Sequence, residues 1–341
     1  MRPTMRAVAY REPLPVEAEA SLIDIDLPTP RPEGRDLLVE VRAVSVNPVD
    51  VKVRSKVAPE PGTARILGFD AAGIVREAGP GASLFRPGDE VFYAGSLIRP
   101  GTNAEYHLVD ERLVGRKPKT LDFAQAAALP LTSLTAWETL FDRIDIRKPV
   151  PGAAPALLIV GAAGGVGSMA IQLARRLTDL TVIATASRPE TQAWCRELGA
   201  HHVIDHRRPL GEQVQALGLG APAFVFSITH TDTHFPAIAD LVAPQGRVGV
   251  IDDPVGIDVT LLKRKSVSLH WESMFTRSTF QTADMDRQHA ILDEVARLVD
   301  SGEIRTTLAE TFGSVSAANL RRAHGFIESG RARGKIVLEG F

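Results

Sequence analysis

Between residues 155 and 271, short apolar runs rich in β-branched residues alternate with stretches of helical periodicity. The apolar runs predict six strands, over residues 156–160, 180–185, 201–205, 223–228, 246–251 and 266–271. Their nearly continuous apolar character is typical of strands that are buried on both faces of a sheet. Strands and helices that alternate in this way predict an α/β fold with a doubly wound parallel sheet.

Two of the intervening helices carry clear signals. The first has an apolar stripe at i, i+3 and i+4 spacing, formed by Val166, Met169, Ala170, Leu173, Ala174 and Leu177. The second is expected to begin at Pro189, a residue suited to the first turn of a helix, and to end before Gly199.

Residues 1 to about 128 follow a different pattern. Strands are expected over residues 36–46 and 71–78, and turns rich in proline and glycine, such as "RPGDEV" at 86–91, separate such segments. This pattern predicts a compact, mainly antiparallel β unit.

The tail from residue 284 is expected to form a helix, followed by a final strand in "GKIVLEGF". We expect this tail to return to the N-terminal unit. The predicted organisation is one domain made of residues 1–129 and 280–341, interrupted by a second domain over residues 130–279.

Composition argues against several classes of protein. The 341 residues are 44% hydrophobic and 23% charged, as in a folded globular protein. A formal net charge of −2 gives no basic field for nucleic acid, and the arginine pairs Arg207–Arg208 and Arg321–Arg322 are interpreted as solvated surface.

Because no apolar run approaches the roughly 20 residues that cross a bilayer, and no apolar stretch of signal-peptide length opens the chain, we expect a cytoplasmic protein without a membrane partner. The single cysteine, Cys195, allows neither an internal disulfide nor a thiolate zinc cluster.

The strongest candidate for a binding site is "GAAGGVG", residues 161–167, which directly follows an expected strand and opens an expected helix. Aligned on the dinucleotide-binding fingerprint, it reads Ala162-x-Gly164-x-x-Gly167, with alanine at the first glycine position. A pyrophosphate can approach the bare backbone and the N–H groups of the helix N-terminus. The expected cofactor-binding residues of this loop are Gly164, Gly165, Val166 and Gly167. The alternative is a tight turn that uses glycine for structure alone.

The residues after the second strand bear on which cofactor binds. NAD sites usually place an acidic residue there to bind the ribose 2′-hydroxyl. Here Ser187 and Arg188 occupy that place, and no carboxylate precedes Glu190. An arginine forms charge-assisted hydrogen bonds with a 2′-phosphate, so the sequence predicts NADPH. The alternative is that Ser187 caps the helix that begins at Pro189 and that Arg188 is solvated.

Six motifs, found in order, resemble a known family: "VNPVD" (46–50), "GFDAAGIV" (68–75), "RPGDEV" (86–91), "ALPLTSLTAWETL" (128–140), "GAAGGVG" (161–167) and "RGKIVL" (333–338). Together they resemble the medium-chain dehydrogenase/reductase superfamily, on its quinone oxidoreductase side. The resemblance covers nearly the whole chain. It implies a GroES-like catalytic domain, a Rossmann domain and commonly a homodimer.

The same resemblance implies that no metal is bound. Zinc-dependent alcohol dehydrogenases of the superfamily place a cysteine where this chain has Asn47, a histidine where it has Phe69, and a third ligand near Leu129. Asp70 alone keeps ligand character, whereas a zinc site needs about three protein ligands. We nevertheless expect similar proteins to carry a zinc-type alcohol dehydrogenase label, because whole-chain similarity transfers it.

Without a metal, reduction of a quinone or an α,β-unsaturated carbonyl is feasible, since conjugation spreads the developing charge. By resemblance, Asn47 and Thr135 face the nicotinamide end of the site. Asp50 would orient its neighbours, and the Lys52 ammonium would stabilise an enolate. The alternatives are a capping role for Asn47 before Pro48, a structural ion pair for Asp50 and an ordinary surface position for Lys52.

The resemblance also implies further cofactor contacts. His206 stands where relatives often have a tyrosine near the adenosine phosphate. Other residues implied along the cofactor groove are Ile228, Thr229, Ile251, Arg333 and Lys335. His230 and His234 are spaced like a metal-binding pair, but no third ligand is near them in the sequence.

Three functions remain open at this point. The favoured one is an NADPH-dependent reductase of a small-molecule quinone or enone. The alternatives are a zinc-type alcohol dehydrogenase and a non-enzymatic NADPH-binding protein of crystallin or sensor type. The segment 265–275 stands where relatives pair their Rossmann sheets, so a homodimer is expected.

Overall fold

The structure is a computed structural model that describes residues 3–341. The chain divides into two compact units: the first runs to Leu134 and resumes at Phe275, and the second is Thr135–Met274. The boundaries expected from the sequence, at 129/130 and 279/280, lie close to these positions.

The second unit is built on a six-stranded parallel sheet in the order β11-β10-β9-β12-β13-β14. The strands are β9 (Ala154–Val160), β10 (Thr181–Thr185), β11 (His202–Ile204), β12 (Pro222–Ser227), β13 (Arg247–Val250) and β14 (Ser268–Trp271). All six expected strands are present. Because the order reverses on either side of β9, the sheet is doubly wound, and the predicted fold class is confirmed.

Helices cover both faces of this sheet. They are α4 (Gly165–Leu177), α5 (Pro189–Glu197), α6 (Leu210–Ala216) and α7 (Thr231–Leu241), with a 3-10 helix η4 (Val259–Lys265) before β14. One face of β9, with Leu158 and Val160, packs against α6 and α7 in a single hydrophobic cluster. Leu157 and Ile159, which alternate with them, are also fully buried. This two-sided burial explains why the strands read as continuous apolar runs.

The first unit is mainly antiparallel. Its strands are β1 (Thr4–Tyr10), β2 (Ile23–Pro28), β3 (Asp36–Val46), β4 (Arg65–Ile66), β5 (Ala71–Ala78), β6 (Glu90–Tyr93), β7 (Tyr106–Asp110), β8 (Val114–Arg116), β15 (Leu308–Thr311) and β16 (Lys335–Glu339). They form a sheet in the order β15-β16-β3-β5-β6-β8, with β7 also paired to β3, and a smaller sheet β2-β1-β4.

The helical segments of the first unit are short, except for two in the tail. They are η1 (Glu19–Ser21), α1 (Pro48–Lys56), η2 (Glu111–Leu113), α2 (Phe123–Ala127), α8 (Thr276–Thr279), α9 (Arg287–Asp300) and α10 (Ala317–Glu328). The helix α3 (Pro130–Trp137) crosses the boundary between the units and continues as a π-helix, η3 (Glu138–Arg143).

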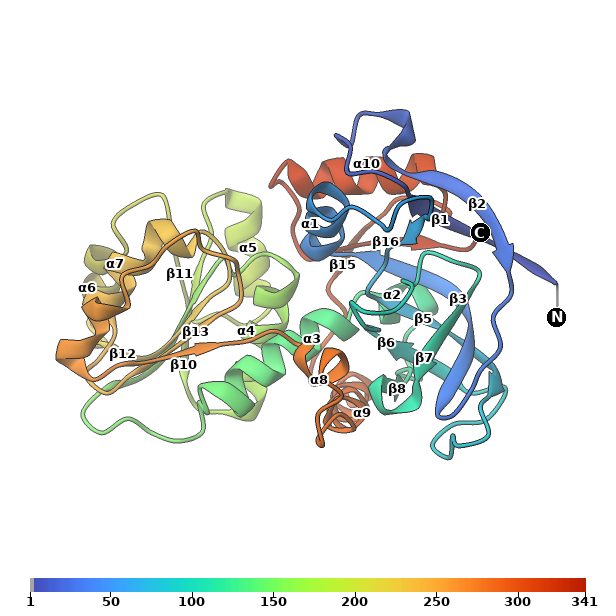
Figure 1. Cartoon of the computed structure of the whole chain (residues 1–341). Helices are drawn as coiled ribbons and strands as arrows, with labels where there is room; N and C mark the ends of the chain where they lie inside the picture. The colour runs from blue at the N-terminus through green and yellow to red at the C-terminus, as the bar shows by residue number, and fades with distance from the viewer. Residues whose placement is uncertain (1–2) are drawn as a thin grey trace. The chain divides into compact units, whose positions relative to one another are not determined.

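The C-terminal tail is an integral part of the first unit. β16 pairs antiparallel with β3, with Ile336 opposite Val46, and lies between β3 and β15. The helix α10 lies beside α1 in the same unit, as Figure 1 shows. Residues more than 200 positions apart in sequence therefore share one sheet.

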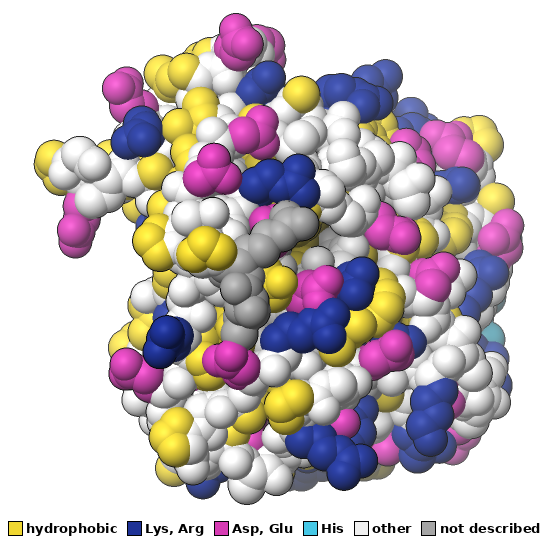
Figure 2. All heavy atoms as spheres, turned by 90° about the vertical axis from the view of Figure 1, so that its right-hand side faces the viewer, with side chains coloured by type: hydrophobic (Ala, Val, Ile, Leu, Met, Phe, Trp, Pro, Cys, Tyr) yellow, Lys and Arg dark blue, Asp and Glu magenta, His cyan; other side chains and the backbone are white. Residues whose placement is uncertain are grey.

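Charged side chains of both signs are interspersed with apolar ones on the face of the molecule drawn in Figure 2. No single-sign patch dominates that face. Among residues 3–341, no helix is long and apolar enough to span a membrane.

The packing of α4 on β9 generates a first prediction. A Cβ added at Gly167 would lie 2.4 Å from the carbonyl oxygen of Ala162 and 2.5 Å from its Cα, both backbone atoms. We expect Gly167→Ala to lower the free energy of unfolding of the second unit by about 1–3 kcal/mol, because α4 must shift away from the loop backbone at Ala162 that follows β9.

Gly211→Ala in α6 is the matched control, since a Cβ there meets nothing within 4 Å. It should leave stability unchanged or raise it by up to about 1 kcal/mol. The three tryptophans, Trp137, Trp194 and Trp271, all lie in the second unit, so their fluorescence in urea titrations measures this unit. Equal midpoints for the two variants would contradict the packing argument.

Candidate functional site

The glycine loop joins the end of β9 to the start of α4. Gly161 has a φ of +85°, and a Cβ there would lie 2.7 Å from the Cγ2 of Thr229. Gly164 is the N-cap residue of α4, and a Cβ on it would approach no atom closer than 3.9 Å. The space over Gly164 is thus open, while that beside Gly167 is filled by the loop itself. The first turn of a helix leaves N–H groups without intrahelical partners, and residues 163–166 are half-buried, so these groups suit a phosphate.

The polar residues after β10 and β11 lie next to each other, because these strands pair in parallel with Thr185 opposite Ile204. Ser187 and Arg188 are half-buried, and Arg188 contacts Glu190 through Nε at 3.2 Å. His206 is also half-buried, and its Nδ1 has no hydrogen-bond partner within the described chain.

Three histidines gather near this edge of the sheet. The ring of His206 meets that of His234 edge to face, with centroids 6.3 Å apart. Burial lowers the pKa of both imidazoles, and His230 lowers both further by charge repulsion. Residues 3–341 contain no group of three or more His, Cys, Asp or Glu side chains that could hold a metal. Burial therefore favours the neutral form of His206 and His234 at the sheet edge.

The loops after β12 and β13 complete this edge. The amide of Ile228 donates to the carbonyl of Val160 at 3.1 Å, and that of Ile251 donates to Ser227 at 3.3 Å. Thr231 donates its amide and its hydroxyl to the carboxylate of Asp252, and so fixes the start of α7. Sequence reasoning missed Asp252, because no local pattern links it to a threonine on another element.

All the predicted cofactor residues of the second unit thus follow the carboxyl ends of neighbouring strands. They are Gly164, Gly165, Val166, Gly167, Ser187, Arg188, His206, Ile228, Thr229 and Ile251. Ligands of open parallel sheets bind along this edge.

The first unit buries a polar cluster around Lys335. Its ammonium contacts Oδ2 of Asp70 at 3.0 Å and the carbonyl of Val46 at 3.1 Å, and also donates to Oδ1 of Asn47. Asn47 in turn donates to Oδ2 of Asp70 at 2.8 Å, and the amide of Leu131 donates to Oδ1 at 2.7 Å. The side chains of Lys335 and Asp70 are 3% and 0% exposed.

Asp50 is the second buried carboxylate beside this cluster. It accepts from the amides of Asn47 at 2.8 Å and Gly68 at 2.9 Å, so Asn47 and Asp50 form the capping box of α1. Burial raises the pKa of Asp50 to about 7, against the opposing effects of these hydrogen bonds and of Lys335. Burial likewise raises the pKa of Asp70, which Lys335 opposes most. Lys335 therefore favours the charged form of both carboxylates, and it is the largest opposing effect for Asp70.

The other predicted residues have different surroundings. Lys52 is exposed on α1, and Arg333 is exposed before β16. Thr135 is the first residue of the second unit, is 5% exposed, and accepts a hydrogen bond on its carbonyl from Thr139 at 2.7 Å. Lys335 is enclosed within the first unit, so its contribution to cofactor binding stays a prediction.

The positions that hold zinc ligands in related enzymes offer little to a metal here. Phe69 is buried against Phe275, with ring centroids 5.3 Å apart, and Leu129 is fully buried. Asn47 and Asp70 are both engaged by the Lys335 ammonium. The donor set therefore does not fit zinc: one carboxylate is present, and it already has a cation.

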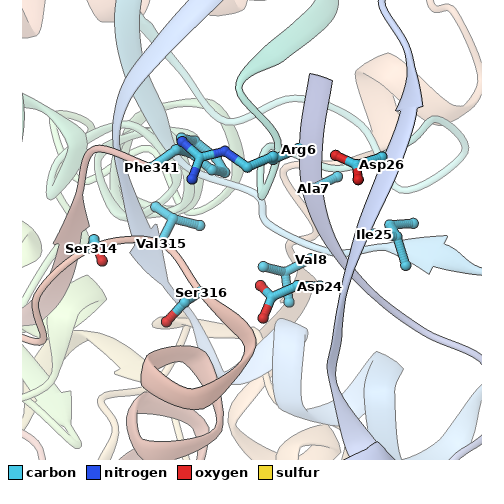
Figure 3. Close-up of a pocket in the computed structure, with 10 residues that line it drawn as sticks. All are labelled: Arg6, Ala7, Val8, Asp24, Ile25, Asp26, Ser314, Val315, Ser316 and Phe341. Carbon is cyan, nitrogen blue, oxygen red and sulfur yellow. The ribbon is translucent and has the colours of Figure 1, made fainter. Parts of the chain in front are cut away.

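A cavity of about 360 Å³ lies elsewhere in the first unit, between β1, β2 and the start of α10 (Figure 3). Two of its charged side chains, Arg6 and Asp24, serve the fold. Arg6 bonds to Glu105, and Asp24 accepts from the amide of Ala317 at the N-terminus of α10. None of the predicted site residues lines it.

Comparison with known proteins identifies the family. The model of the alcohol dehydrogenase GroES-like domain matches residues 33–119, and that of zinc-binding dehydrogenases matches residues 198–338. A zinc-type alcohol dehydrogenase-like protein of Staphylococcus aureus is 39% identical over 98% of this chain and 99% of its own length. The expectation that similar proteins carry a zinc-type alcohol dehydrogenase name is therefore confirmed.

Two solved structures extend the comparison. A candidate zinc-dependent alcohol dehydrogenase from Rhizobium etli CFN 42 is 66% identical, with a TM-score of 0.98 over 99% of this chain and 98% of that one. The quinone oxidoreductase from Coxiella burnetii is 26% identical, with a TM-score of 0.81 over 99% and 100% of the two chains. Full-length similarity, both domain models and the glycine loop agree: the chain belongs to the medium-chain dehydrogenase/reductase superfamily and is an oxidoreductase.

Proposed function

We propose that the protein is an NADPH-dependent reductase that transfers hydride to a quinone or an α,β-unsaturated carbonyl without a metal. The observation that carries this proposal is the Lys335 ammonium, which bonds to Asn47 and Asp70, at the very positions where related enzymes use metal-binding chemistry. A divalent ion bound to Asn47 and Asp70 would lie next to the Lys335 ammonium, and the two positive charges would repel each other strongly in this buried site.

The second unit supports the choice of cofactor. The open space over Gly164 and the N-terminus of α4 suit a pyrophosphate, and Ser187 with Arg188 suits a 2′-phosphate. When bound, NADPH supplies a hydride from C4 of its nicotinamide. We propose that Ile228, Thr229 and Ile251 position that ring, and that His206 contacts the adenosine phosphate.

Residues of the first unit would serve the chemistry in two ways, by holding Asn47 in place and by hydrogen-bonding the acceptor oxygen. Asn47 is fixed by Asp50, Asp70 and Lys335, so its amide is held in one orientation. Asp50 orients and does not react. Lys52 keeps a solvent-exposed ammonium that can hydrogen-bond an oxygen carrying developing negative charge.

The acceptor must already be activated, because no Lewis acid polarises it. The hydride that a bound NADPH would supply would reduce the β-carbon of an enone or a quinone, with a proton from water or a donor to balance it and NADP⁺ as the second product. Conjugation places the negative charge on oxygen, where hydrogen bonds stabilise it. The similarity to a quinone oxidoreductase supports this class of acceptor.

We also propose a homodimer formed through β14. This strand pairs only with β13 within the described sheet, and Trp271 on it is 54% exposed. An exposed edge strand with a large apolar side chain is a surface that a second copy can cover.

Activity and metal content test the main proposal together. Purified protein should oxidise NADPH faster than NADH with a panel of quinones and enones, contain less than stoichiometric zinc by mass spectrometry, and keep its rate in a chelator. Stoichiometric zinc with alcohol oxidation would favour the zinc-type alternative. NADPH binding without turnover on any acceptor would favour the non-enzymatic one.

The Lys335–Asp70 pair generates a prediction on stability. We expect Lys335→Met to lower the free energy of unfolding by about 3–5 kcal/mol, because Asp70 is left charged, buried and uncompensated. Adding Asp70→Asn should recover most of the loss. Calorimetric unfolding checks both, with the exposed Lys56→Met as the control.

The pH dependence of this variant has a definite sign. Without the lysine, the folded-state pKa of Asp70 rises further above its unfolded value, so the folded protein binds more protons between the two values. Lys335→Met should therefore regain stability as the pH falls below its new pKa. A loss that is equal at pH 5 and pH 8 would contradict the electrostatic explanation.

The dimer is tested at Trp271. Trp271→Glu should convert the protein to monomer in light scattering, because it places charge on the edge that a partner would bury. Ile98→Glu, which changes another exposed apolar residue, should leave the mass unchanged. A wild-type monomer, or a dimeric Trp271→Glu variant, would overturn the β14 interface.

A further inference from the structure

Arg207 is held in a defined position although most of its side chain is in solvent. Its side chain is 65% exposed, yet Nη2 donates to the carbonyl of Ser187 at 2.7 Å. Nε and Nη2 also bond to both carboxylate oxygens of Asp205, at distances between 2.7 and 3.2 Å. From the sequence alone, this arginine is indistinguishable from solvated surface.

These contacts orient the guanidinium more than they stabilise the fold. A surface ion pair contributes little to stability. The bonds engage Nε and Nη2, and within residues 3–341 no hydrogen bond involves Nη1. The guanidinium is thus held through Nε and Nη2, and the two N–H groups of Nη1 can donate to the oxygens of a phosphate.

Strand register places this group next to Arg188. Thr185 lies opposite Ile204, and the amide of Ala186 donates to the carbonyl of Ile204 at 2.9 Å. Arg207 then bonds to the carbonyl of Ser187, the residue directly before Arg188. Two arginines therefore flank the end of β10, one from its own loop and one from the loop after β11.

We propose that Arg207 is a specificity-determining residue that binds the 2′-phosphate of NADPH together with Arg188, and that Asp205 is the positioning residue that holds it. This inference rests on the proposed function and adds a residue to its cofactor site. A phosphate dianion between two guanidinium groups gains charge-assisted hydrogen bonds that a 2′-hydroxyl cannot match.

Asp205 does not play the part of the acidic residue that binds the ribose 2′-hydroxyl in NAD-dependent enzymes. Its carboxylate accepts from the amide of Arg207 at 2.9 Å as well as from the guanidinium. These bonds lower the pKa of Asp205 to about 2. A ribose hydroxyl would have to compete with a charged partner already in place.

The test compares Arg207→Gln with Arg208→Gln, which removes the same charge one position along. Isothermal calorimetry measures binding of NADPH, NADH, 2′,5′-ADP and 5′-AMP to each full-length protein. Arg207→Gln should weaken NADPH and 2′,5′-ADP by ~10- to 100-fold and leave NADH and 5′-AMP within ~2-fold. Arg208→Gln should change none of the four, and both variants should keep the wild-type melting temperature.

The outcomes separate this inference from the proposed function. If the wild type binds NADH as tightly as NADPH, the proposed preference for NADPH is wrong. If it prefers NADPH and Arg207→Gln keeps that preference, only the role of Arg207 fails. Arg207→Lys adds a further measurement: it keeps the charge but loses the bonds of Nε and Nη2 that orient the guanidinium, so its NADPH affinity should fall between those of wild type and Arg207→Gln.

Discussion

The buried ion pair between Lys335 and Asp70 is the interaction on which the first unit depends. It joins β16 to the start of β5, and through Asn47 and the amide of Leu131 it also reaches the starts of α1 and α3. A buried charge that loses its partner is strongly destabilising. Each of these segments is therefore held in place by the requirement that one ammonium and one carboxylate stay together.

The second unit is organised by a geometric constraint rather than a charge. In a parallel sheet every strand delivers its following loop to the same edge. The strand order brings together the glycine loop, the arginine-bearing loops after β10 and β11, and the loops after β12 and β13. Side-chain contacts such as that of Thr231 with Asp252 then hold neighbouring loops in place. Backbone hydrogen bonds from Ile228 to Val160 and from Ile251 to Ser227 tie these loops together.

The contrast explains how much the sequence could predict. The sequence pattern locates all six strands of the second unit and places the ends of α4 and α5 to within a residue. It also predicts β3 and β5 with their observed bounds. These elements can be predicted because buried positions recur at regular spacing along the chain. The family resemblance, and not periodicity, is what points to His206, Ile228, Thr229 and Ile251 among the edge residues. The Lys335–Asp70 pair spans 265 positions and leaves no periodic trace, and neither do the π-helix after α3 or the anchoring of Arg207. Such contacts depend on which side chains meet across the fold, which spacing alone does not encode.

The position of β16 within its sheet has a consequence for biosynthesis. It lies between β3 and β15, so the first unit cannot close its central sheet until residue 339 has left the ribosome. At ~5–20 residues per second, β3 waits tens of seconds for its neighbour, while the second unit is already complete. During that interval a nascent chain exposes an unpaired edge of β3 and an aspartate without its buried counter-ion.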